Sequence, residues 1–131
     1  VTELSIIGSE LGNVMHVLKN NEDSFLEFGE IYISTVNFNS IKAWKQHKKM
    51  TMNLIVPVGK VKFVFYESST NRFKEEIIGA ERYARITVPP KLWFGFKGLD
   101  NDRNLIINVS NILHNPEEQL REDLKKFEYN W

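Results

Sequence analysis

Short segments in which apolar and polar residues alternate follow one another along most of this chain. The clearest is residues 61–66, where Val61, Phe63 and Phe65 fall on one face of an extended backbone, because successive side chains of a strand point to opposite sides. Segments of similar length, rich in β-branched and aromatic residues, occur at 4–7, 14–18, 30–36, 54–59, 73–78, 83–88, 93–96 and 104–110. Turn-forming residues separate them, and many short strands joined by turns are typical of a β-sandwich or β-barrel.

Only the C-terminal part departs from this strand pattern. Pro116 begins a segment with acidic residues in its first turn, which predicts one short helical turn over 116–120. The last residues, 127–131, are largely aromatic, and we expect them to pack back onto the body of the protein. No linker, repeat or low-complexity segment interrupts the chain, so residues 1–131 are predicted to form a single domain.

The composition is that of an ordinary globular protein, with 42% hydrophobic and 26% charged residues among 131. The formal net charge is zero, which argues against a general nucleic-acid binder. There is no cysteine, which excludes disulfides, a thiolate metal site and a cysteine nucleophile. No apolar run approaches the ~18 residues of a membrane span, and the N-terminal residues do not resemble a signal peptide. We therefore expect a soluble, cytoplasmic protein without a membrane partner.

The densest group of positive charges, residues 42–53, leads directly into the apolar segment 54–59. If this stretch stays extended, one of its faces carries a polar row formed by Lys45, His47, Lys49, Thr51 and Asn53. Such a row either points to solvent or lines the mouth of a barrel. In the second case the neighbouring lysines lower the pKa of His47 by like charge, which leaves a neutral base, and they attract an anionic substrate.

Other kinds of site find less support in the sequence. A metal centre needs three or four assembled ligands, whereas His16, His47 and His114 are far apart and no glutamate follows His47 closely. Neither a nucleophile-elbow motif nor a glycine-rich phosphate loop is present. His16 lies in an apolar segment and is interpreted as structural, whereas His114 is a turn residue that can reach a site. Trp93 is a candidate for stacking on a base or a sugar.

Several motifs occur in an order that resembles one known family. They are Ile33–Val36, Lys42–Lys45, Val58–Val61, Thr87–Lys91 and Trp93–Phe96. Over roughly residues 30–118 this order is similar to that of the cupin-fold nucleotide-sugar epimerases of the dTDP-4-dehydrorhamnose 3,5-epimerase family. A short bacterial subgroup with Trp-Lys-x-His before Met-Thr-x-Asn-Leu resembles it further, through Trp44, Lys45, His47, Met50, Thr51, Asn53 and Leu54. The resemblance implies an all-β, single-domain cupin, a double-stranded β-helix or jelly-roll barrel, with a short C-terminal helical segment.

The chain departs from this family at the catalytic positions. In the simplest alignment Lys45 stands where the family has its catalytic histidine, and Lys42 where it has an arginine. His47 instead matches the second histidine of the related sugar 3,4-ketoisomerases. The tyrosine acid of the family would fall near Ile112 or Leu113, and the aspartate that orients the histidine lies in a C-terminal extension beyond Trp131. Both groups are therefore expected to be missing.

The resemblance implies an epimerase of a nucleotide-linked 4-keto-6-deoxy sugar that needs neither metal nor cofactor. It also implies a role in bacterial surface-carbohydrate (lipopolysaccharide) biosynthesis and a homodimer that pairs through its sheets. His47 is the expected base beside the keto group, and Lys45 the expected stabiliser of the enolate. The other expected substrate contacts are Lys42, Lys49, Asn53, Trp93, Tyr66, Tyr83 and His114. The last three are candidates for the acid. A nucleotide-sugar 3,4-ketoisomerase and a non-catalytic sugar-binding cupin are the alternatives.

Overall fold

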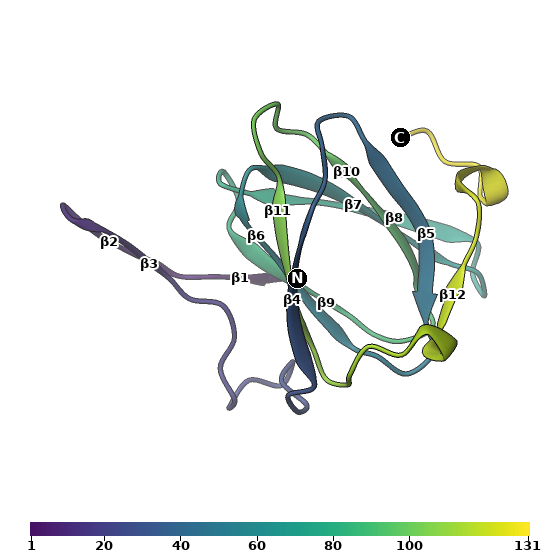
Figure 1. Ribbon diagram of the computed structural model, residues 1–131, viewed down its shortest axis with the longest axis horizontal. Helices are drawn as coiled ribbons and strands as arrows, with labels where there is room; N and C mark the ends of the chain where they lie inside the picture. Colours follow the sequence, from purple (N-terminus) through teal and green to yellow (C-terminus); the bar gives the residue numbers. More distant parts are fainter.

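The computed structural model describes residues 1–131 as two five-stranded antiparallel sheets and a separate hairpin (Figure 1). The first sheet has the order β1 (Thr2–Glu3), β9 (Ala84–Val88), β6 (Met52–Val58), β11 (Leu105–Ser110) and β4 (Glu30–Thr35). The second has the order β12 (Gln119–Arg121), β5 (Ile41–His47), β10 (Trp93–Gly98), β7 (Lys60–Glu67) and β8 (Arg72–Gly79). The hairpin consists of β2 (Ile6–Ser9) and β3 (Gly12–Met15). The predicted all-β fold is confirmed.

One hydrophobic core lies between the two sheets, which face each other like the halves of a barrel (Figure 1). On β7, Val61, Phe63 and Phe65 point into this core and are buried, as the alternation predicts. Val64 lies on the outer face of the same strand. Gly59 makes the tight connection between β6 and β7 with φ +84°, where an added Cβ would lie 2.0 Å from the carbonyl oxygen of Arg103. Only glycine fits this turn.

The C-terminal segment, residues 122–131, covers an aromatic cluster on the outer face of the second sheet. Trp44 of β5 is buried there beside Trp93 and Val64, and Phe127 and Trp131 pack against it. Backbone hydrogen bonds join Trp44 to Glu122 in both directions, and the Trp44 indole donates to the carbonyl of Leu124 at 3.2 Å. The expectation that the aromatic tail packs onto the body is confirmed.

The helical turn predicted over 116–120 is present in part, as the 3₁₀ turn η1 (Pro116–Glu118), whereas Gln119 and Leu120 belong to β12. The side chain of Asn115 caps it by accepting a hydrogen bond from the backbone of Glu117 at 3.0 Å. A second 3₁₀ turn, η2 (Leu124–Lys126), lies in the C-terminal segment. Neither turn, nor any other part of the chain, forms a helix with the length and hydrophobicity that crossing a bilayer requires.

The hairpin β2–β3 extends away from the sheets at the N-terminal end of the chain (Figure 1). Its side chains are largely exposed, and Leu11 at its tip is 100% exposed. The segment that follows returns to the outer face of the first sheet, where buried Arg85 holds it. The Arg85 guanidinium pairs with Glu22 at 2.5 Å and donates to Ser24 Oγ at 2.7 Å and to the carbonyl of Val17 at 2.6 Å.

One expectation about the basic stretch is wrong: it is not a single continuous strand. The strand β5 ends at His47, the chain bends at Lys48 and Lys49, and β6 begins at Met52 in the opposite sheet. The bend reverses the alternation, so that Met52 points into the core and Asn53 points outward. The cause of the bend is a tertiary contact. The carboxylate of Glu118, which is distant in sequence, accepts hydrogen bonds from the backbone N–H groups of the bend.

Candidate active site

A cavity of about 600 Å³ opens between β4 of the first sheet and β5 and β12 of the second. Part of its wall is the hydrophobic core itself, where it is lined by Met52, Leu54, Phe63, Phe94, Phe96 and Ile106. The rest of the lining is formed by Tyr32, Ser34, Lys42, Ala43, Trp44, Lys45, Asn108, Arg121 and Glu122. An apolar enclosure with a few convergent polar groups is the usual form of a small-molecule site.

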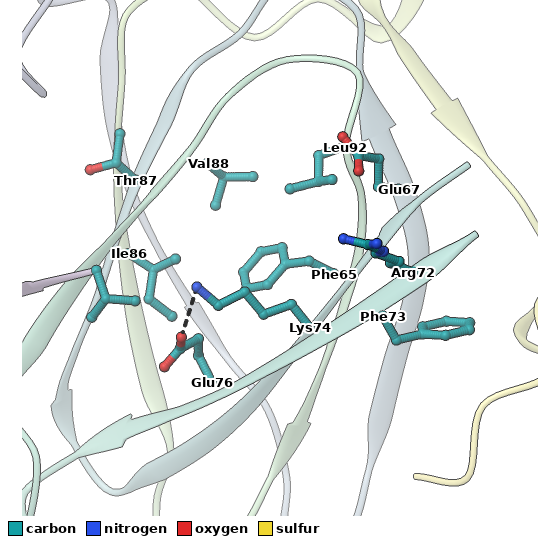
Figure 2. A pocket seen from close by; sticks show the side chains of 11 residues that line it. Phe65, Glu67, Arg72, Phe73, Lys74, Glu76, Ile86, Thr87, Val88 and Leu92 are labelled. Carbon is teal, nitrogen blue, oxygen red and sulfur yellow. Dashed lines mark ion pairs between the residues drawn. The ribbon is translucent and has the colours of Figure 1, made fainter. Parts of the chain in front are cut away.

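A second cavity, of about 490 Å³, lies beside β8 and β9 (Figure 2). Phe65, Ile86 and Val88 form part of its apolar wall, and the side chains of Arg72, Lys74, Glu67 and Glu76 surround it. Lys74 is paired with Glu76 at 3.1 Å, which the dashed line in Figure 2 marks. None of the site residues expected from the sequence lines this cavity, so the candidate active site is the one beside β5.

His47 and Glu118 form a buried pair at the end of β5. His47 is 2% exposed and Glu118 8% exposed, and the His47 Nδ1 hydrogen-bonds to Glu118 Oε1. The other carboxylate oxygen, Oε2, accepts from the backbone N–H groups of Lys48 and Lys49, each at 3.0 Å, and of Met50 at 3.3 Å. Glu118 therefore orients the histidine and also stabilises the bend that ends β5.

The electrostatics of this pair leave His47 neutral beside an ionised carboxylate. Burial lowers the pKa of His47, and the nearby Lys45 lowers it further, against the opposing effect of Glu118. Burial by itself raises the pKa of Glu118, but the hydrogen bonds from His47 and from the backbone of Lys49 and Met50 bring it below its usual value. With its proton on Nδ1, the His47 ring has a free lone pair on Nε2.

The free nitrogen of His47 has no hydrogen-bond partner within the protein. Nε2 is buried, and the ring stacks on Phe94 with centroids 6.1 Å apart. Phe94 lines the cavity, whereas His47 itself is not part of the lining. His47 is therefore a desolvated, unpartnered base immediately behind the cavity wall.

Of the cations that line the cavity, Lys45 is the least exposed: it is half-buried, whereas Lys42 and Arg121 are exposed. In the strand register it is opposite Phe94 on one side and Arg121 on the other. Burial lowers the pKa of its amine, Arg121 lowers it further by charge repulsion, and Glu118 acts in the opposite direction. Lys45 thus lies in the cavity wall, two residues from His47 on the same strand.

Tyr32 and Asn108 face the cavity from the first sheet. They are directly opposite one another on β4 and β11, and Asn108 Nδ2 donates to Tyr32 Oη at 2.7 Å. Burial raises the pKa of Tyr32, and the charges of Glu30 and Glu118 raise it further, while the bond from Asn108 opposes them. The Tyr32 phenol therefore keeps its proton at neutral pH.

The structure brings some of the other expected residues near this site. Lys42 lines the cavity, and its Nζ donates to the carbonyl of Thr35 at 2.7 Å. Lys49 is exposed outside the cavity and contributes its backbone N–H to Glu118. His114 is also exposed, and its charge is close enough to His47 to lower the pKa of the ring.

Four expected contacts lie elsewhere in the fold, which corrects the sequence-based assignment. Asn53 points outward from β6 and bonds to the carbonyl of Ser24 and to Thr87. Trp93 and Tyr66 belong to the aromatic cluster under the C-terminal segment. Tyr83 donates its hydroxyl proton to the carbonyl of His16 at 2.9 Å. On their strands, the alternation turns Asn53, Tyr66 and Trp93 away from the barrel interior, whereas Tyr83 lies just before β9.

The sequence analysis missed four residues that the fold gathers here, which are Tyr32, Asn108, Glu118 and Arg121. For one of them, Tyr32, the sequence pattern carries a signal. On β4 the half-buried inward positions carry Glu30, Tyr32 and Ser34, whereas Ile31 and Ile33 are 53% and 63% exposed. This reversal of the usual pattern marks a polar interior at that strand. The chain was expected to lack the aspartate that orients the histidine in the family, and Glu118, which belongs to a 3₁₀ turn, hydrogen-bonds to the His47 ring instead. No cluster of three or more potential metal ligands is present.

Comparison with known proteins places the chain in a family. No protein-family model matches the sequence. A protein of Haloferax volcanii, described as a probable low-salt glycan biosynthesis epimerase, is 22% identical over 125 residues, which is 90% of this chain and 80% of the relative. The crystal structure of a dTDP-sugar isomerase from Desulfovibrio desulfuricans is 33% identical, covers 99% of this chain and 88% of its own, and has a TM-score of 0.93. The chain belongs to this family of dTDP-sugar isomerases.

A more distant structure shows how well the architecture is kept. A 3'-monoepimerase from Streptomyces bikiniensis, in complex with dTDP, is only 12% identical, yet it covers 99% of this chain and 72% of its own with a TM-score of 0.86. Both the predicted cupin-type barrel and the resemblance to the nucleotide-sugar epimerases are confirmed.

Proposed function

We propose that this protein is an isomerase that moves a proton next to the keto group of a nucleotide-linked 4-keto-6-deoxy sugar, as an epimerase without metal or cofactor. Its pathway would be the biosynthesis of a surface glycan such as lipopolysaccharide. The observation that carries the proposal is the neutral, carboxylate-held His47 with an unpartnered Nε2 behind the wall of an apolar cavity. Membership in a family of dTDP-sugar isomerases supports the choice of substrate.

The reaction begins with removal of a proton from the carbon beside the ketone. That proton is acidic because the resulting negative charge spreads onto the carbonyl oxygen, and a base near neutrality removes it most effectively. His47 Nε2 accepts the proton, while Glu118 holds the other ring nitrogen protonated and stabilises the imidazolium that forms. Lys45, on the same strand, supplies positive charge near the developing oxyanion.

A second group must return a proton to the sugar, and Tyr32 is the candidate that the geometry favours. It lines the cavity from the sheet opposite β5, so a sugar between the sheets meets the phenol on one side and, on the other, the wall formed by Phe94, behind which His47 lies. Because Asn108 Nδ2 donates to Tyr32 Oη, the phenol proton is directed elsewhere. The Oδ1 of Asn108 is buried and has no hydrogen-bond partner within the protein.

The diphosphate of the substrate fits the exposed end of the cavity. Lys42 and Arg121 are exposed cavity-lining cations, and neither is part of an ion pair with a carboxylate. Arginine and lysine are well suited to phosphate oxygens. Arg121 was not expected from the sequence and replaces Lys49 in this role.

One experiment separates epimerisation from its rivals. The protein is incubated with a dTDP-4-keto-6-deoxy sugar in heavy water, and the ring protons are followed by NMR. Deuterium at carbon three or five supports the epimerase, and migration of the keto group supports a 3,4-ketoisomerase. Saturable binding without exchange supports a binding protein. The variant His47→Asn should abolish exchange and leave nucleotide-sugar affinity within a few fold, and full activity of this variant would exclude His47 as the base.

We also propose a homodimer in which two first sheets pack through their outer faces. Ile31 and Ile33 expose apolar side chains on the outer face of β4, and cross-strand neighbours Ile107 and Val109 extend this surface on β11. Exposed apolar sheet faces of this kind favour an interface, and a two-fold axis pairs the same face of two copies.

A further inference from the structure

One aromatic side chain separates the proposed base from the cavity. Phe94 forms part of the cavity wall and is 5% exposed, and His47 lies behind it at 2% exposed. The two rings are nearly parallel, with an interplanar angle of 16° and centroids 6.1 Å apart. A general base must come within about 2.6–3.2 Å of the group whose proton it takes. Because His47 Nε2 is buried behind this wall, a sugar in the cavity does not reach it while Phe94 keeps this position.

The surroundings of Nε2 indicate that its partner comes from outside the protein. Glu118 holds the His47 ring through the other nitrogen, whereas Nε2 is buried and has no hydrogen-bond partner. Leaving a buried acceptor unpaired costs free energy, and most buried polar atoms therefore find a partner. A fixed ring with one orphaned nitrogen is the arrangement expected if the substrate brings the missing partner.

The strand that carries Phe94 is irregular at this point. β10 keeps its register with β7 throughout, but its pairing with β5 shifts between Phe94, which is opposite Lys45, and Phe96, which is opposite Lys42. β5 therefore has one extra residue across from Gly95, which is a β-bulge. A bulge interrupts the ladder and is often found beside an active site, where it redirects a side chain.

We propose that Phe94 is a gate between the cavity and the base. Its ring covers His47 in the free protein and turns aside when the sugar enters, so that Nε2 meets the carbon beside the ketone. The inference rests on the proposed function in one respect, since it takes His47 to be the base. In the closed position the ring keeps water away from Nε2. Closing loops exclude water in this way in many enzymes, and here a single side chain does so.

The closed state is tested with diethyl pyrocarbonate, which acylates unprotonated imidazole nitrogens, at a pH of about 7.5, where histidines are largely neutral. Peptide mapping by mass spectrometry separates the histidines, and the exposed His114 is the internal reference. If the open state has a population of about 0.1–10%, His47 should be acylated about 10- to 10³-fold more slowly than His114. Equal rates at the two histidines would overturn the proposal.

Phe94→Leu removes the ring and should raise the acylation rate of His47 about tenfold or more. Phe96→Leu is the matched control, because Phe96 lines the same cavity from the same strand but packs against Phe63. It should leave the acylation of His47 unchanged, and an equal rise in both variants would overturn the gate. Circular dichroism checks the fold of each variant, and Phe94→Met replaces Phe94→Leu if the latter does not fold.

Opening by the substrate is tested with dTDP-glucose, which has no ketone to react. In a crystal structure of the complex the Phe94 ring should have moved, and His47 Nε2 should lie within hydrogen-bond distance of the sugar or of a water molecule beside it. A bound sugar with Phe94 still covering His47 would overturn the gate.

The gate and the proposed function can fail separately. Ring deuteration by a protein whose His47 is acylated as fast as His114 overturns the gate and leaves the isomerase intact. A protected His47 that Phe94→Leu exposes, in a protein that deuterates no keto sugar, supports the gate and overturns the proposed isomerisation.

Discussion

Glu118 holds His47 in place and also ends the strand that carries it. One carboxylate oxygen bonds to the imidazole, and the other accepts from three successive backbone N–H groups. The tautomer of His47 and the course of the chain at residues 48–50 therefore depend on the same side chain. This coupling explains how the site has an orienting carboxylate although the carboxylate comes from a 3₁₀ turn 71 residues further along the chain.

Replacing Glu118 by glutamine tests this arrangement. The amide can donate to Nδ1 and so forces the ring proton onto Nε2, which removes the lone pair that acts as base. We expect ring deuteration to fall roughly 10²- to 10⁴-fold, in the range seen when a triad carboxylate is neutralised. Glu117→Gln, an exposed neighbour, is the control and should retain activity. Equal activity in both variants would contradict the assigned role of Glu118.

The pH dependence of the deuteration rate should report the burial of His47. Because burial and Lys45 lower the pKa of His47, the base stays neutral to a lower pH than a free imidazole does. The rate is therefore full above the ordinary histidine value of about 6.5 and is lost only as the pH falls through the lower pKa in the folded protein. Unfolding the chain restores the ordinary pKa, so stability also declines as the pH falls below about 6.5. A deuteration rate that already falls at pH values above 6.5 would contradict this prediction.

Tyr32→Phe should separate the two proton transfers. The base remains, so deuterium should still enter the sugar with retained configuration, while inverted product falls roughly 10²- to 10⁴-fold because the acid is absent. The measurement is the ratio of deuterated substrate to epimerised product by NMR. Tyr83→Phe, whose hydroxyl lies outside the cavity, is the matched control. If the Tyr32 variant gives a normal ratio, the acid is another group.

Gly95→Ala tests the packing of the C-terminal segment. A Cβ at this position would lie 2.4 Å from Ala43 Cβ and 2.8 Å from the ring of Trp131, so the aromatic tail must move away. We expect a loss of about 1–3 kcal/mol in the free energy of unfolding, the usual cost of overpacking, measured by urea denaturation. Gly8→Ala in the exposed hairpin meets only a side-chain oxygen at 3.3 Å and should change stability little.

The proposed dimer predicts a change of assembly in Ile33→Lys. A charge in the centre of the exposed apolar face of β4 should convert the dimer to a monomer, which sedimentation velocity measures directly. Ile77→Lys places the same charge at another partly exposed isoleucine, on β8 of the other sheet, and should leave the dimer intact. Identical sedimentation of both variants would exclude this face as the interface.

The pattern along the chain was sufficient to predict most of the strands and the packing of the aromatic tail. These features follow from local periodicity and composition, and β7 shows it most simply, because its alternation alone assigns Phe63 and Phe65 to the core. The order of the motifs along the chain was also sufficient to predict the family. The sequence predicts Lys45 and His47 as residues of one site because they share one face of one strand, and neighbouring residues stay together in any fold that keeps the strand.

The composition of the site was decided only by the tertiary structure. Tyr32, Asn108, Glu118 and Arg121 come from four separate elements, and no local pattern specifies which of them converge when two sheets close on each other. Asn53 was misassigned for the same reason: the bend that Glu118 stabilises shifts the alternation by one position and turns that side chain outward. The alternation of side chains along a strand shows which residues share one face of it. Long-range contacts decide where the strand ends and which residues of other elements pack against that face.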